Sequence, residues 1–265
     1  MRKFVMVFAT LLLSLVMAAH EFWIQPDRYL YEAGQTIYLR FWVGENFEGK
    51  NWSGNGLSVA RIQIRQNKLS DDLTGNIGEL PGDSLELSLH DEGTAMITMQ
   101  TNNKLISLDA FKFREYLVEE GLQNAIEYRE NNHENDSSGH ELYQRSVKTI
   151  IQVGDELSSC CLKETGLPLD IIPLKNPYDP ALRDSLKLLV KFKREAIKGQ
   201  LMKVWHRVGN QTRKFEIRTS DKGIISIPLE KSGKWMISTV NMIRIEDSSA
   251  QWQSYWASCN WGYYR

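Results

Sequence analysis

The residue with the most specific chemistry in this sequence is His20, the first histidine of the chain. It directly follows residues 1–19, which have the pattern of a secretory signal peptide. If a signal peptidase cuts after Ala19, the mature chain begins with a histidine. Its free α-amine and its imidazole Nδ1 can then bind one metal ion together, whereas an internal histidine offers a single nitrogen to it. This position therefore predicts a site for a nickel, cobalt or copper ion.

The first 19 residues contain the three parts of a secretory leader. Arg2 and Lys3 supply the positive charge, residues 4–17 are almost continuously apolar, and Ala18 and Ala19 are the small residues that the peptidase requires. The apolar run is too short for a comfortable membrane span. We therefore expect a periplasmic or secreted protein whose mature chain has no transmembrane anchor.

Two cleavage sites remain open, and they give different metal ligands. A cut after Ala19 places the bulky Met17 at the −3 position, whereas a cut after Ala18 places Val16 there. The second cut leaves Ala19 ahead of His20. The amine, the intervening amide and the imidazole then suit square-planar copper(II) or nickel(II).

A second metal ligand is predicted at His206, which lies in the segment 204–207 (VWHR) of a predicted strand, residues 201–207. His206 can meet His20 only if two parts of the fold pack with these ends together. Otherwise it is an ordinary strand histidine with its own hydrogen bonds. The remaining histidines fall in turn-forming or polar loop segments and are expected to be solvated: His90, His133 and His140.

The three cysteines allow a disulfide without fixing one. Cys160 and Cys161 are adjacent, and Cys259 is distant in the sequence. Export permits one of the pair to bridge to Cys259, which would leave one thiol over. The spacing matches no zinc motif.

Composition and motifs exclude several functions. The formal net charge is −1, with no basic stripe, so nucleic acid is not an expected partner. The chain has no glycine-rich phosphate loop, no His-Glu-x-x-His and no Gly-x-Ser-x-Gly. The carboxylate pairs Asp71-Asp72 and Glu119-Glu120 fall in turn or helix-surface contexts. We predict that the protein is not an enzyme.

Strand-like patterns dominate the mature chain. Residues 35–43 are rich in β-branched and aromatic side chains, and residues 84–89 and 94–100 alternate between polar and apolar. Residues 108–131 break this pattern: they contain no proline, show helical spacing and can be capped by Asp109, which predicts one or two helices interrupted near Gly121.

We therefore predict an all-β fold of two Ig-like β-sandwich units. The first spans residues 20–156 and includes the helical insertion at about 108–131, and the second spans residues 166–265. Eight tryptophans and ten tyrosines cluster toward the two ends of the chain. They either fill the sandwich core, which is the favoured interpretation, or form a stacking surface for sugars or peptides.

Several motifs resemble a known family. Residues 19–24 (AHEFWI), directly after a signal peptide, are similar to the start of exported bacterial proteins of unknown function that open with Ala-His-Asp/Glu-Phe-Trp. These are grouped with periplasmic components of nickel-uptake systems, the NikM-like proteins. Residues 166–173 (GLPLDIIP), 176–178 (NPY) and 252–258 (WQSYWAS) also look like this family. Residues 199–240 look like a carboxypeptidase-regulatory or other Ig-like module, which implies a fold and not an activity.

The resemblance implies an exported β-sandwich protein that handles a transition metal. One departure weakens this: where such proteins often read His-Met after the strand that contains Trp235, this chain reads Asn241-Met242. Two functions stay open. In the first, His20 binds the metal and delivers it to a membrane metal-uptake system. In the second, a metal-free module uses sheet edges and exposed aromatic side chains to bind another envelope protein or a glycan.

Overall fold

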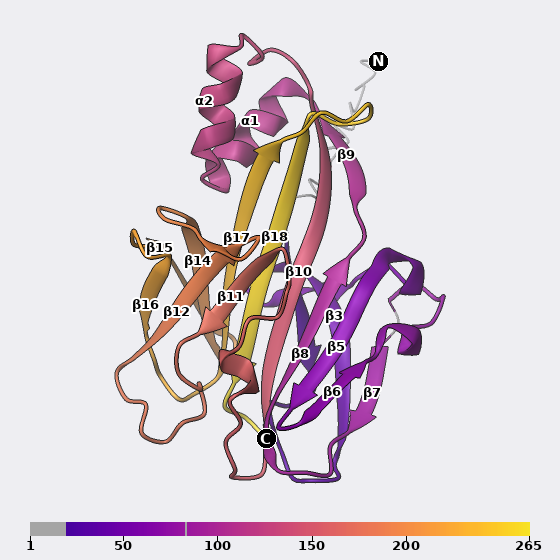
Figure 1. The fold of residues 1–265 in the computed structure, drawn as a ribbon, viewed down its shortest axis with the longest axis vertical. Coiled ribbons are helices and arrows are strands. Elements are labelled where there is room, and N and C mark those ends of the chain that lie inside the picture. Colours follow the sequence, from indigo (N-terminus) through magenta and orange to yellow (C-terminus); the bar gives the residue numbers. More distant parts are fainter. Residues whose placement is uncertain (1–19, 83) are drawn as a thin grey trace, which may run out of the picture.

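The chain folds mainly into strands that form three sheets, so the all-β prediction is confirmed (Figure 1). The computed structural model describes residues 20–82 and 84–265, and the predicted signal peptide, residues 1–19, lies outside the described residues. In this described part, no helix has the length and apolar character needed to cross a membrane.

The largest sheet runs through the whole molecule. Its order is β15-β14-β17-β18-β10-β8-β5-β6, and β2 and β9 also pair with β10. These strands are β2 (Leu30–Tyr31), β5 (Val59–Gln66), β6 (Leu69–Asp72), β8 (Gly93–Thr101), β9 (Lys104–Leu108), β10 (Gly139–Val153), β14 (Leu201–Val208), β15 (Gln211–Arg218), β17 (Lys234–Arg244) and β18 (Trp252–Gly262).

Two four-stranded sheets pack against this central sheet. The first consists of β1 (Glu21–Pro26), β3 (Thr36–Glu45), β4 (Glu48–Asn51) and β7 (Ser84–Ser88). The second consists of β11 (Leu169–Pro173), β12 (Ser185–Phe192), β13 (Glu195–Ala196) and β16 (Ile224–Pro228).

Alternation along β10 places a core on each face of the central sheet. Val147 and Ile151 belong to the core beneath the first small sheet, whereas Ile150 belongs to the core beneath the second. The two predicted units thus share this sheet, because β10 from the first pairs in parallel with β18 from the second. The boundary between residues 156 and 166 stays a prediction.

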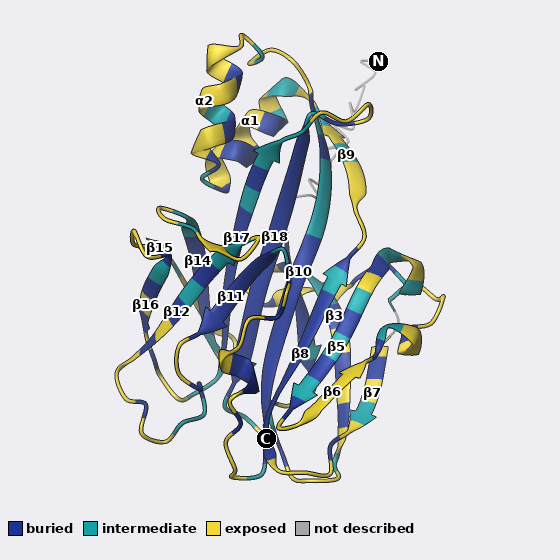
Figure 2. Cartoon of the chain, in the orientation of Figure 1, coloured by how far each residue is buried: buried dark blue, intermediate teal, exposed yellow. Residues whose placement is uncertain are grey.

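The aromatic side chains mostly fill the interior, as the favoured interpretation expects. The largest fully buried side chains include five tryptophans: Trp23, Trp205, Trp235, Trp252 and Trp261. Strand β18, which carries two of them, is buried along its whole length (Figure 2).

The helical insertion consists of α1 (Ala110–Glu119) and α2 (Gln123–Asn131), which confirms its prediction. The Asp109 side chain caps α1 by accepting a hydrogen bond of 2.9 Å from the Lys112 backbone N–H. Gly121 separates the helices with φ of +64°, a conformation that glycine adopts without steric cost. Both helices pack against Trp252 at the end of the central sheet (Figure 1).

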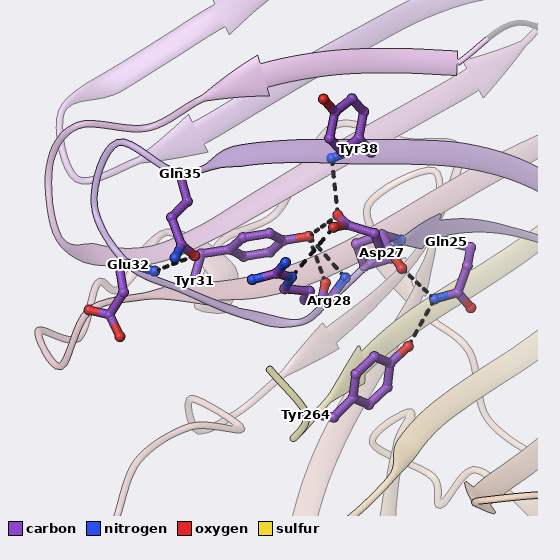
Figure 3. Close-up of polar contacts among 9 residues, drawn as sticks. Gln25, Asp27, Arg28, Tyr31, Glu32, Gln35, Tyr38 and Tyr264 are labelled. Atoms are coloured by element: carbon purple, nitrogen blue, oxygen red, sulfur yellow. Dashed lines mark hydrogen bonds and ion pairs between the residues drawn. The ribbon is translucent and has the colours of Figure 1, made fainter.

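A polar cluster fixes the end of β1 that lies far from His20. The Tyr31 hydroxyl donates to Asp27 Oδ1 at 2.7 Å, and the same oxygen accepts from the Tyr38 backbone N–H at 3.1 Å (Figure 3). Gln25 donates to the Tyr264 hydroxyl at 3.1 Å. Strand β1 is therefore anchored at one end, and its other end presents His20 and Glu21.

Candidate functional site

His20 lies at the edge of a pocket of about 320 Å³, here called the charged pocket. His20 directly precedes β1, which contributes Glu21, the end of β3 contributes Glu45, and helix α1 forms the opposite wall. The lining is rich in charge: it includes Glu21, Glu45, Glu115, Glu119, Lys112, Lys203 and Lys214. The helical insertion thus closes a pocket over the first residues after the predicted leader.

Strand register brings His20 next to two carboxylates. Glu21 pairs with Gly44, so continuing the ladder by one residue places His20 opposite Glu45. Glu45 in turn pairs with Glu48 across the β3–β4 hairpin. Directly opposed residues share a face of the sheet, with Cβ atoms about 4.5–5.5 Å apart. His20, Glu45 and Glu48 therefore form one row across three strands.

The tight turn that aligns this row is built by two residues with positive φ, Asn46 at 56° and Phe47 at 60°. Such angles are typical of the two-residue turn that matches the twist of a hairpin. Phe47 is buried against Trp23 with ring centroids 5.8 Å apart, edge to face. Packing of Phe47 thus holds an uncommon backbone conformation and keeps Glu45 opposite Glu48.

Both carboxylates of the row are exposed, and each faces a cationic side chain that is partly buried. Glu48 Oε1 lies 3.0 Å from Arg207 Nη1, and Glu45 Oε1 lies 3.9 Å from Lys214 Nζ. Each glutamate side chain is more than half exposed. The exposed oxygens of these carboxylates are therefore open to a ligand from solvent.

The floor of the charged pocket is a buried polar group of three side chains. Lys203 Nζ lies 2.7 Å from Glu120 Oε1, and both side chains are at most 3% exposed. Glu21 is also buried, and its Oε2 has no hydrogen-bond partner among the described residues. Burial raises the pKa of Glu21 to about 8, against the opposing charge of Lys203. Glu120 therefore carries the ion pair with Lys203, and Glu21 is largely protonated at neutral pH.

A second buried carboxyl lies behind Tyr116 of the pocket wall. Glu141 Oε1 accepts from the Tyr116 hydroxyl at 3.3 Å and from the Ser254 hydroxyl, which itself accepts from Trp256 Nε1 at 3.1 Å. Burial raises the pKa of Glu141 to about 7.

The burial of these charged side chains does not follow from the sequence pattern. The sequence predicts Glu120 at a helix surface, yet it is 3% exposed, because this residue follows α1 and turns inward to Lys203. The assignment of Glu120 was wrong, whereas Glu119 is exposed as expected. Lys203 and Glu141 lie in strand segments where a charged residue ordinarily indicates the solvent face, so the sequence contained no signal for their burial.

His206 lies outside the pockets that His20 lines, and its two ring nitrogens already have partners. Nε2 lies 2.9 Å from the Ser232 carbonyl oxygen, and Nδ1 lies 3.0 Å from an Arg213 nitrogen. The ring stacks on Trp235 with centroids 3.9 Å apart. These partners assign the proton to Nε2 and engage the lone pair of Nδ1. A role of His206 as a second ligand stays a prediction that this hydrogen bonding does not favour.

The candidate metal donors are few. Within residues 20–82 and 84–265, no three histidine, cysteine, aspartate or glutamate side chains form a group that could hold a metal ion. This absence concerns side chains, whereas the predicted site at His20 also uses the α-amine released by cleavage. Asn241, where the resembling family often has histidine, lies in β17 opposite Tyr255.

The cysteines contribute no ligands to the charged pocket. Cys160, Cys161 and Cys259 are all buried and free, so the disulfide that export permits is not formed in this structure. Burial raises the pKa of both Cys161 and Cys259 to about 12.

Solved structures of low identity resemble the chain over most of its length. The D0-D1 domain of Intimin matches at 12% identity, covering 91% of this chain and 97% of that chain, with a TM-score of 0.22. A two-domain fibronectin type-III segment from chicken tenascin matches at 9% identity, covering 88% and 95%, with a TM-score of 0.21. Dimeric latent PorU from Porphyromonas gingivalis matches at 9% identity, covering 92% and 21%, with a TM-score of 0.21.

Sequence comparison gives a family and no closer relative. No curated protein matches the chain. A family model matches residues 17–243, a span that includes His20, the helical insertion and every residue of the charged pocket. The chain therefore belongs to the family described as Domain of unknown function (DUF4198).

Proposed function

We propose that this protein is an exported β-sandwich protein that binds one nickel, cobalt or copper ion through a mature N-terminal His20, as an accessory to a membrane metal-uptake system. The observation that carries the proposal is the register of β1 on β3, which places His20 opposite Glu45 at the charged pocket. The released α-amine and the imidazole supply two nitrogens, and Glu45 supplies an oxygen from the facing strand. Nitrogen and carboxylate donors of this kind suit divalent first-row metals.

The charged pocket contains a further oxygen that fits a cation. Glu21 Oε2 is buried and lacks a hydrogen-bond partner in the described part of the chain. A buried polar atom without a partner is energetically costly, so its presence favours a ligand or an ion at that place. Metal ions compete with protons for such donors, and the proton held by Glu21 can be released on binding.

The second function, a metal-free module that binds an envelope protein or a glycan, has less support. Glycan binding would use exposed aromatic faces, and most of the tryptophans are buried in the core.

The deciding experiment compares matched N termini. The protein is prepared with His20 as its first residue, its terminus is verified by mass spectrometry, and nickel(II), cobalt(II) and copper(II) are titrated by calorimetry. We expect one equivalent to bind. A tripeptide extension before His20 and the variant His20→Ala should each weaken binding by about tenfold or more, equivalent to at least about 1.4 kcal/mol.

Variants of the neighbouring strand test the carboxylate. Glu45→Gln should weaken metal binding several-fold, whereas Glu86→Gln should leave it unchanged, since Glu86 is exposed on β7 away from the charged pocket. Equal, weak binding by the His20 terminus and by His20→Ala would reject metal binding and leave the metal-free module.

A further inference from the structure

A second pocket, here called the Arg145 pocket, borders His20 on its other side. It has a volume of about 580 Å³ and lies between the β3–β4 hairpin, strand β9 and the first half of β10. Its volume is in the range of small-molecule sites in proteins. Apart from His20 and Glu45, its lining differs from that of the charged pocket.

The most unusual group in this pocket is Arg145 itself. The residue is 5% exposed, yet its guanidinium has no carboxylate within ion-pair distance among the described residues, and its Nε is buried without a hydrogen-bond partner. Its closest companions are aromatic: the guanidinium carbon lies 5.2 Å from the ring centroids of both Phe22 and Tyr143. Burial of a charge without a counter-ion is strongly unfavourable, so the native protein holds this cation for a reason other than stability.

The other walls add positive charge and an aromatic face. Lys50 and Lys104 line the pocket, and Lys104 Nζ lies 6.0 Å from the centroid of the Trp52 ring. Two carboxylates, Glu45 and Glu48, also lie at its edge, but each already faces a lysine or arginine of its own. The pocket therefore has a surplus of positive charge beside the apolar surfaces of Tyr143 and Ile106.

From this arrangement we propose that the Arg145 pocket binds a small organic monocarboxylate with a planar apolar body. Its carboxylate pairs with the Arg145 guanidinium, which has the two parallel donors that carboxylates accept. Its planar part lies against Tyr143 and Ile106, which are partly exposed and line the pocket. The site rests on Arg145 and not on a free N terminus, so it is independent of metal binding at His20.

The test uses benzoate as the probe and benzamide as its neutral isostere, titrated into the purified chain by calorimetry and by tryptophan fluorescence. We expect saturable 1:1 binding of benzoate and binding of benzamide that is weaker by about tenfold or more, because a charged pair is stronger than a neutral hydrogen bond. Arg145→Gln should lose the preference for benzoate, whereas His20→Ala should retain it. Equal binding of the two probes, or unchanged benzoate binding by Arg145→Gln, would overturn the proposal.

A second variant keeps the test valid if Arg145→Gln fails to fold. Ile106→Trp fills the pocket from strand β9, because Ile106 is opposite Glu141 and so shares the face of the sheet that carries Tyr143 and Arg145, and it leaves the guanidinium in place. It should abolish benzoate binding. The control Leu57→Trp, at an exposed leucine outside the pocket lining, should not. Benzoate binding unchanged by Ile106→Trp would place the ligand elsewhere and overturn the proposal.

Discussion

Lys203 and Glu120 form a buried ion pair, with Nζ and Oε1 2.7 Å apart, that joins the helical insertion to the central sheet. Lys203 lies in β14, and Glu120 is the residue that follows α1. The pair lies beside Glu21 at the floor of the charged pocket. The opposite charge of each partner favours the charged form of the other. One interaction thus contributes both to the docking of α1 and to the electrostatics next to His20.

Removing one partner of this pair should destabilise the fold. Lys203→Met leaves the Glu120 carboxylate buried without its ion-pair partner, so we expect a loss of about 3–5 kcal/mol in the free energy of unfolding. Urea unfolding followed by tryptophan fluorescence measures it. Lys222→Met, at an exposed turn lysine, is the matched control and should change stability by less than about 0.5 kcal/mol. A loss for Lys203→Met as small as that of the control would contradict the role of the pair.

The raised pKa of Glu141 predicts a pH-dependent stability. The carboxyl titrates near 7 in the folded state and near 4.5 when unfolded, so the native state binds more protons between these values. The stability that Glu141 contributes is fully present below pH 4.5 and is lost as pH rises to about 7. Comparing the chain with Glu141→Gln, which keeps an acceptor for Ser254 and Tyr116, should show a relative gain for the variant of about 2–3 kcal/mol from pH 4.5 to pH 8. Parallel stability–pH curves for the two proteins would reject this assignment.

The elements of the fold could be predicted from local patterns, and the chemistry of the site only in part. Alternation in residues 84–89 and 94–100 matched β7 and β8, and Asp109 and Gly121 marked the cap and break of the helices, because these signals depend on neighbouring residues alone. The partner of His20 depends instead on the register between β1 and β3.

The burial of charged side chains could not be predicted from the sequence. Lys203, Glu141 and Arg145 have the same residue types as solvent-facing charges, and their environment follows from long-range packing. Glu120 can be buried because Lys203, 83 residues away in the sequence, donates a hydrogen bond to it and balances its negative charge. The same holds for His206, whose partners Arg213 and Ser232 come from β15 and a turn that no local pattern links to it.

The thiols should be unreactive in the folded protein. Burial raises the pKa of Cys161 and of Cys259 to about 12 and also raises that of Cys160, so little thiolate is available to an aromatic disulfide reagent at neutral pH. We expect the native protein, isolated without reductant, to show no measurable reaction with the reagent. In denaturant, three thiols per chain should react. Detection of a single thiol in denaturant would instead mean that two of the cysteines are bridged.

The contact between Gly139 and Phe113 makes α1, and with it one wall of the charged pocket, sensitive to a single methyl group. A Cβ on Gly139 would lie 2.3 Å from Phe113 Cγ, and Phe113 is fully buried between Tyr116 and Trp252, where its ring cannot move away. We therefore expect Gly139→Ala to lower the free energy of unfolding by about 1–3 kcal/mol through overpacking.

Matched variants separate this steric effect from the intrinsic effect of replacing glycine. Gly75→Ala has open space around the new methyl group and should be close to neutral. Combining Gly139→Ala with Phe113→Leu should cost less than the sum of the two single changes, since the smaller side chain makes room for the methyl group. Because α1 carries Glu115 and Glu119, hydrogen exchange of its amides should also speed up in Gly139→Ala and be slowed again in the double variant. Additive losses in the cycle, with α1 exchange unchanged, would show that the Gly139–Phe113 contact does not position this wall of the pocket.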